Sequence, residues 1–151
     1  MVLMAFAPAS MGVAYEEIAE LLKEQKVECV LETDFAKIIK QIQEVDFEAL
    51  ILEVALNDKE NVLRLDITSH QYLQGAYLAR ALRKGKFGDL NKNKPVFFLP
   101  WSTEKQESVK VKNILGEEPR FLDLLIDDAC TISQKVIIEL KKINLTGGQN
   151  A

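Results

Sequence analysis

The sequence has only two cysteines, Cys29 and Cys130, and a single histidine, His70. Two cysteines so far apart in the chain provide neither a disulfide framework nor the ligand spacing of a zinc site, so we expect two reduced, buried thiols. His70 is far in sequence from both cysteines and precedes a predicted helix. A nucleophile activated by a neighbouring histidine base therefore finds little support.

The sequence also lacks a surplus of positive charge and any long hydrophobic run. Its 19 Lys and Arg residues against 23 Asp and Glu residues give a net charge of −4. Phosphate backbones and anionic membrane surfaces attract basic proteins, so we expect neither a nucleic acid nor a membrane as partner. The apolar run at residues 2–7 has no basic leader and ends at Pro8, too short for a membrane span. We expect a cytoplasmic protein.

The chain has the size and apolar content of one domain. Its 151 residues are 48% hydrophobic, which is enough for a substantial core. No long linker or internal repeat divides it. We expect a single domain at 1–144, followed by a flexible C-terminal tail at 145–151 that contains two glycines.

Apolar segments of strand length alternate with segments of helical spacing. The predicted strands span residues 2–7, 27–31, 49–52, 95–100 and 121–126. The predicted helices span residues 14–26, 35–42, 72–84, 104–115 and 132–143. Thr33 or Asp34 can cap the second helix, and the segment 57–69 has no clear periodicity. This alternation predicts an α/β fold with a doubly wound five-stranded parallel sheet, flavodoxin-like, with strand order 2-1-3-4-5.

Ligands of doubly wound sheets bind beyond the carboxyl ends of the strands. The loop after the first strand, residues 7–12, contains one glycine and does not offer the row of free amides that cradles a phosphate. We therefore expect no nucleotide, flavin or other cofactor.

Four carboxylates follow predicted strands and leave two interpretations open. They are Glu53, Asp58, Asp127 and Asp128. Oxygen ligands of this kind can hold a magnesium ion, and a small magnesium-dependent phosphotransfer or hydrolytic domain would use them. The other interpretation is that they are solvated acids without a shared role.

The segment 47–58, with the helix and strand at 75–83 and 95–99, resembles the receiver domain of two-component response regulators. The resemblance extends over nearly the whole chain. It implies that the third strand ends at the position of the phosphoacceptor aspartate, which here is Glu53. It also implies a signalling function and protein partners.

The sequence departs from the receiver pattern at each position that handles phosphate. Ala7 and Pro8 replace the acidic pair that holds magnesium, and Pro100 and Trp101 precede Ser102 after the fourth strand. No lysine lies between Lys112 and Lys135. The resemblance is therefore to a degenerate, phosphorylation-independent pseudo-receiver. The longer carboxylate of Glu53 carries its charge further out than an aspartate, in partial imitation of a phosphorylated side chain.

Such a domain is expected to be non-catalytic and to act by binding a protein partner, which includes a second copy of itself. Receivers commonly use the face formed by the fourth helix, fifth strand and fifth helix. Here that face draws on the helices at 104–115 and 132–143. Trp101, the only tryptophan, precedes the first of these. Tryptophan is enriched at interface hot spots, so Trp101 is the candidate interaction residue, the alternative being a half-buried loop aromatic.

Overall fold

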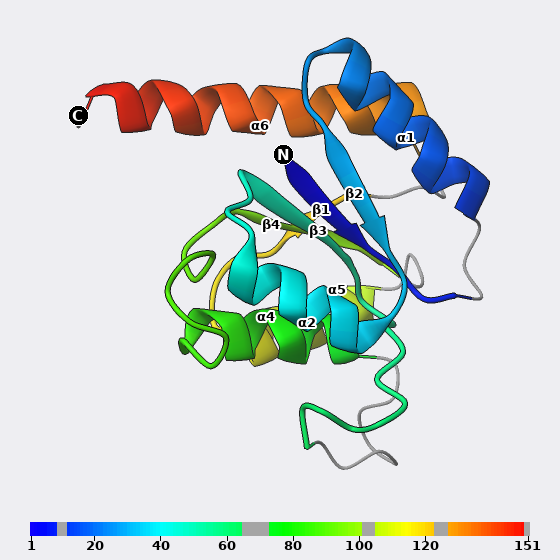
Figure 1. Cartoon of the computed structure of the whole chain (residues 1–151), viewed down its shortest axis with the longest axis vertical. Coiled ribbons are helices and arrows are strands. Elements are labelled where there is room, and N and C mark those ends of the chain that lie inside the picture. The colour runs from blue at the N-terminus through cyan, green and yellow to red at the C-terminus, as the bar shows by residue number, and fades with distance from the viewer. Residues whose placement is uncertain (9–11, 65–72, 101–104, 123–126, 150–151) are drawn as a thin grey trace.

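The computed structural model describes residues 1–8, 12–64, 73–100, 105–122 and 127–149 (Figure 1). The strands are β1 (Val2–Ala5), β2 (Cys29–Glu32), β3 (Ala49–Glu53), β4 (Val96–Leu99) and β5 (Arg120–Phe121). The helices in the described residues are α1 (Gly12–Glu24), α2 (Phe35–Glu44), α4 (Gln74–Arg83), α5 (Lys105–Leu115) and α6 (Ala129–Gln149).

The strands form one parallel sheet of order β2-β1-β3-β4-β5, which confirms the predicted flavodoxin-like fold. In register, Ala5 of β1 lies beside Leu52 of β3, and Leu52 lies beside Phe98 of β4. The carboxyl ends of β1, β3 and β4 therefore meet at one edge of the sheet, with Glu53 beside Leu99.

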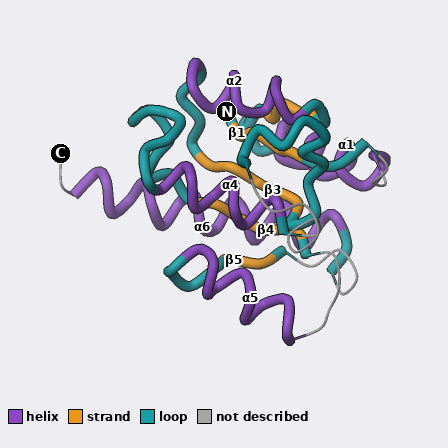
Figure 2. The backbone as a smooth tube through the Cα atoms, turned by 90° about the horizontal axis from the view of Figure 1, so that it is seen from below, coloured by secondary structure: helices purple, strands orange, loops and turns teal. Residues whose placement is uncertain are grey.

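Two layers of helices cover the sheet. Helices α1 and α6 lie on one face, and α2, α4 and α5 lie on the other (Figures 1 and 2). Successive side chains of a strand pack into the hydrophobic cores on opposite faces of the sheet, because side chains alternate between the two faces of a strand. Leu50 and Leu52 join the core under α2 and α4, whereas Ala49 and Ile51 join the core under α1 and α6. This two-sided burial explains the uninterrupted apolar runs in the sequence.

Helix α2 forms as its pattern predicts. Asp34 is the N-cap, and its carboxylate accepts a hydrogen bond from the backbone N–H of Lys37 at 3.2 Å. The predicted apolar stripe is buried; it consists of Phe35, Ile38, Ile39 and Ile42. The cap and the stripe together fix where α2 begins and which face it turns to the sheet.

The structure differs from the prediction in the bounds of β5, in the length of α6 and in the burial of the two cysteines. Strand β5 is Arg120–Phe121 and begins one residue before the predicted strand at 121–126; residues 123–126 lie outside the described part. Helix α6 continues to Gln149, so residues 145–149 are helical. Extending a helix is easier than starting one, although each glycine is about 1 kcal/mol less favourable than alanine. Both cysteines are free, but Cys29 is only partly buried and Cys130, in the first turn of α6, is exposed. None of the described helices is long and apolar enough to cross a bilayer.

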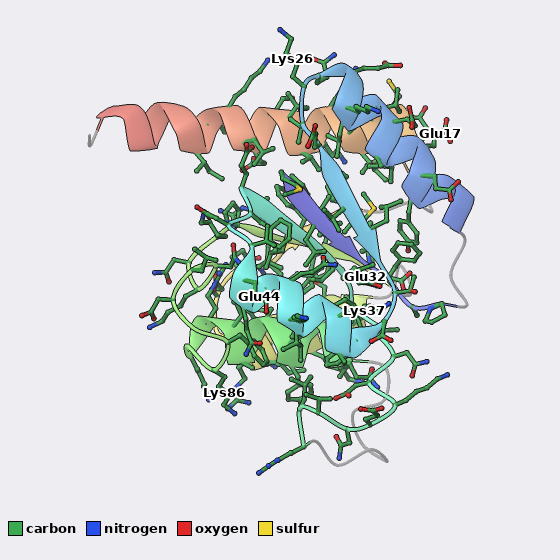
Figure 3. The ribbon with its side chains drawn as sticks, in the orientation of Figure 1. Glu17, Lys26, Glu32, Lys37, Glu44 and Lys86 are labelled. Atoms are coloured by element: carbon green, nitrogen blue, oxygen red, sulfur yellow. The ribbon has the colours of Figure 1, made fainter. Side chains whose placement is uncertain are left out.

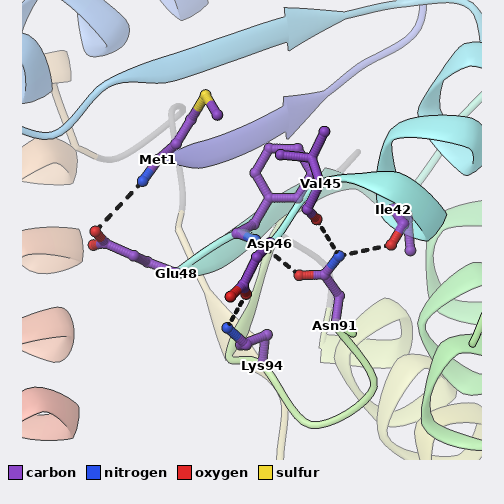
Figure 4. Close-up of polar contacts among 8 residues, drawn as sticks. Met1, Ile42, Val45, Asp46, Glu48, Asn91 and Lys94 are labelled. Atoms are coloured by element: carbon purple, nitrogen blue, oxygen red, sulfur yellow. Dashed lines mark hydrogen bonds and ion pairs between the residues drawn. The ribbon is translucent and has the colours of Figure 1, made fainter. Parts of the chain in front are cut away.

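A buried asparagine fixes the amino-terminal side of the sheet. Asn91 is 0% exposed, and its Oδ1 accepts from the N–H of Phe47 at 2.9 Å. Its Nδ2 donates to the carbonyl oxygens of Ile42 and Val45, both at 2.6 Å (Figure 4). The loop before β4 is thereby joined to the turn after α2, and an ion pair between Lys94 and Asp46 lies beside this contact.

Candidate functional site

Glu53 ends β3 at the edge where the carboxyl ends of the strands meet, and its half-buried carboxylate has partners on both oxygens. Oε1 accepts a hydrogen bond from the backbone N–H of Ala7 at 2.7 Å. Oε2 accepts one from the hydroxyl group of Tyr15. Ala7 lies in the loop after β1 and Tyr15 lies in α1, so this one side chain joins both segments to β3.

An aromatic pair covers the place next to Glu53. Phe6 follows β1, and its ring centroid lies 4.3 Å from that of Tyr15. Both rings are buried, with 7% and 4% of the residue exposed. Beyond β1, residues 6–8 are thus phenylalanine, alanine and proline, whose side chains offer no oxygen ligand to a metal ion.

Helix α4 begins in close contact with the backbone at the end of β3. The N–H of Gly75 donates to the carbonyl of Val54 at 2.8 Å. A Cβ on Gly75 would lie 2.0 Å from the carbonyl oxygen of Glu53, closer than any such contact in proteins. Glycine is therefore required there, and its close approach fixes α4 against the strand that carries Glu53.

The other three candidate carboxylates have separate roles. Asp58 accepts the N–H groups of Val62 at 2.8 Å and Leu63 at 3.0 Å, which shapes the loop after β3. Asp127 forms an ion pair with Lys135. Within the described ranges, no three Asp, Glu, His or Cys side chains form a group that could hold a metal ion. The structure does not bring the four predicted carboxylates together.

Asp128 caps α6. Its carboxylate accepts the N–H of Thr131 at 2.8 Å, and the hydrogen bonds from the backbone and side chain of Thr131 lower the pKa of Asp128. This interaction explains why α6 begins at Ala129, before the predicted start.

A pocket of about 290 Å³ lies between the start of α2 and the loop after β3, where Asp34 and Asp58 line it. Several N–H groups beside this pocket are already engaged, because Glu32 accepts from those of Thr33 at 3.0 Å and Asp34 at 3.2 Å, and Asp34 accepts from that of Lys37 at 3.2 Å.

Apolar side chains are exposed on both helices that flank β5. Val109 of α5 is 56% exposed and Ile138 of α6 is 53% exposed. A hollow of about 280 Å³ between β5 and α6 is lined by Phe121, Leu122 and Ile138, with Lys135 at its rim. Trp101, Ser102 and His70 lie outside the described residues.

Sequence reasoning identified Glu53 but missed its partner Tyr15. Tyr15 lies in the first turns of a predicted helix that follows the first strand. The helix after the first strand begins beside the carboxyl ends of the strands in a doubly wound fold, so the polar groups in its first turns were the available signal.

Comparison with known proteins supports the fold. No family model matches the sequence, and no curated protein matches it. Among solved structures, a two-component response regulator from Clostridium difficile matches at TM-score 0.68 and 16% identity, covering 95% of this chain and 97% of that one. The Francisella response regulator 1452 receiver domain matches at TM-score 0.66 and 18% identity, covering 94% and 97%. A CheY-like receiver domain protein from Methanospirillum hungatei matches at TM-score 0.66 and 11% identity, covering 93% of each chain. The chain therefore has the fold of response regulator receiver domains.

Proposed function

We propose that this protein is a non-catalytic signalling module that binds a protein partner without being phosphorylated. The observation that carries the proposal is the carboxylate of Glu53, which accepts hydrogen bonds from Ala7 and Tyr15 at the position where a receiver has its phosphoacceptor. These internal donors use one acceptor site on each oxygen and hold the carboxylate in place, so they compete with a metal ion or a phosphoryl group for it.

In the described part of the chain, no group of carboxylates around Glu53 could hold the cation that phosphoryl transfer requires. Transfer depends on a cation, and on fixed positive charge, to balance the phosphoryl oxygens. The buried ring of Phe6 and the backbone of Ala7 occupy the loop that would supply carboxylates for the cation. The first lysine after β5 is Lys135, which pairs with Asp127. The protein needs no cofactor under this proposal, and we place it in the cytoplasm.

The partner surface that we propose is the face of α5, β5 and α6. Exposed Ile138 lines a hollow together with Phe121 and Leu122, and Val109 of α5 is a second exposed apolar side chain. Exposed apolar side chains beside a hollow are typical of a surface that binds a partner. Trp101 precedes α5 in the sequence and remains the candidate anchor residue of this face.

The test is incubation with magnesium and acetyl phosphate, followed by intact-mass measurement. We expect no added phosphoryl group, and no saturable change in the fluorescence of Trp101 when magnesium alone is titrated. A stoichiometric gain of one phosphoryl group would refute phosphorylation independence and support the magnesium-dependent alternative.

The binding half of the proposal is tested with two matched surface variants. Ile138→Lys places a charge in the centre of the α5, β5 and α6 face, whereas Val62→Lys places one at another exposed apolar position, 42% exposed. Proteins that are retained by the unphosphorylated wild type should be lost with Ile138→Lys and kept with Val62→Lys. Equal retention by both variants would exclude this face.

A further inference from the structure

Strand β2 forms one edge of the sheet, and its outer backbone is open. Val2 donates to the carbonyl of Glu28 at 2.7 Å, and Phe6 donates to that of Glu32 at 3.1 Å. These carbonyls point towards β1. Because alternate residues of a strand direct their N–H and C=O groups to opposite sides, Cys29 and Leu31 direct theirs away from β1. In the described part of the chain, no strand pairs with this outer edge.

Three of the four side chains of β2 are apolar, and all four residues, including Glu32, are only half-buried. Cys29 and Leu31 pack partly against the core under α1 and α6, and Val30 packs partly against the core under α2 and α4. The strand contains no proline, glycine or lysine, the residues that commonly protect an edge. The opposite edge is protected, because β5 has only two residues and follows Pro119, which has no N–H group.

We propose that β2 pairs antiparallel with β2 of a second copy of this chain, and that Cys29 lies on the twofold axis. The two sheets then join into one continuous sheet. Cys29 exchanges backbone hydrogen bonds with Cys29 of the second copy, and the N–H of Leu31 reaches the carbonyl of Val27 of the second copy. The N–H of Val27 is already used, since it donates to Leu22 at 2.9 Å.

The charges select this register. Glu28, Val30 and Glu32 share one face by alternation, whereas Lys26 lies in the turn before the strand, with a φ of 64°. Lys26 and Glu32 lie near the two ends of the strand (Figure 3). With Cys29 on the axis, Glu28 lies opposite Val30, and exposed Lys26 comes within reach of Glu32 of the second copy.

Neighbouring registers place acids opposite each other. With Val30 on the axis, Glu28 meets Glu32 of the second copy. With Glu28 on the axis, it meets itself, and with Leu31 on the axis, Glu28 meets Asp34 of the second copy. Like charges directly opposite one another destabilise a strand pair, so charge complementarity favours the register with Cys29 on the axis.

The dimer is weak, because a pair of short strands buries less surface than a standard stable interface. It leaves the face of α5, β5 and α6 free, since β2 and β5 are opposite edges of the sheet. This inference does not depend on the proposed function; phosphorylation of Glu53 would leave it standing.

The experiment is sedimentation velocity from about 1 µM to about 1 mM protein, a range that covers weak association. We expect a concentration-dependent dimer in the wild type. Lys26→Glu should raise the dimer Kd about tenfold, or about 1.4 kcal/mol, because two attractive pairs become repulsive. Lys86→Glu makes the same charge change at an exposed position far from β2 and should have no effect (Figure 3).

The cysteine on the axis reports the register directly. In a hydrogen-bonded antiparallel pair the Cα atoms lie about 5.5 Å apart, which suits a disulfide. Burial raises the pKa of the Cys29 thiol from 9.0 to about 11, so oxidation with diamide is performed at alkaline pH. The Cys130→Ser variant should form a covalent dimer through Cys29.

Three results would overturn the proposal: a monomer at every concentration, equal dimer constants for wild type and Lys26→Glu, or a dimer that does not cross-link at Cys29. A dimer that Ile138→Lys abolishes would assign self-association to the other edge and would likewise overturn it.

Discussion

Removing the hydroxyl group of Tyr15 tests the contact that defines the candidate site. Tyr15→Phe keeps the ring and its packing on Phe6, at a centroid distance of 4.3 Å, and deletes only the donor to Glu53. A hydrogen bond to a charged acceptor contributes about 1.5–3 kcal/mol, and this one lies in a partly buried place. We expect Tyr15→Phe to lower the free energy of unfolding by about 2 kcal/mol.

A double-mutant cycle separates this contact from other effects of the substitution. Glu53→Gln retains the size of the side chain and removes its charge. If the hydroxyl and the carboxylate act as a pair, the double variant loses less stability than the sum of the single variants, with a coupling free energy of about 1 kcal/mol or more. Urea unfolding followed by far-ultraviolet circular dichroism gives all four values.

The matched control couples Tyr15→Phe with Glu48→Gln. Glu48 is exposed and interacts with the amino terminus at 3.4 Å, at the opposite end of the sheet. These two changes should add within about 0.5 kcal/mol. If the coupling free energy of the Tyr15 and Glu53 pair were also within about 0.5 kcal/mol, the view that α1 holds the carboxylate of Glu53 would be refuted.

Two further substitutions test the supports of the sheet, each by urea unfolding. Gly75→Ala should destabilise the protein by about 1–3 kcal/mol through its clash with Glu53, although alanine is the better helix former by about 1 kcal/mol. The control is Ser108→Ala at an exposed position of α5, which should be neutral or stabilising. If Gly75→Ala stabilised the protein instead, the backbones of α4 and β3 would separate easily, contrary to this expectation. Asn91→Ala should cost about 3–5 kcal/mol, because the buried N–H of Phe47 and two carbonyls lose their partner; a loss below about 1 kcal/mol would mean that water replaces the amide.

The sequence was sufficient to predict the sheet because its central strands are buried on both faces. Residues 49–53 and 96–99 are apolar at nearly every position, and prolines bracket the second of them, so both strands could be located almost to the residue. The start of the fifth strand was less clear, because it begins at the charged Arg120, one residue before the apolar run.

The contacts of the candidate site could not be predicted in the same way. Tyr15 fits the apolar stripe of α1, and Asn91 fits a polar loop, so local pattern explained both residues without their partners. Each partner lies far along the chain, on an element whose distance from the residue is set by packing alone. Single-sequence periodicity carries no information on such pairs.

Under the proposed function, Glu53 occupies the position of a receiver's aspartate, and its neighbours are consistent with that proposal. A glutamate reaches one methylene further than an aspartate, and in this structure that reach ends on the N–H of Ala7 and the hydroxyl of Tyr15. Glu53→Asp alone would therefore withdraw the carboxylate from these donors while Phe6 still occupied the adjacent loop. It would remove a structural contact without creating a cation site. Under the proposed function, restoring phosphoryl transfer requires acids after β1 and a lysine after β5 as well, since the cation and the counter-charge act on the same oxygens.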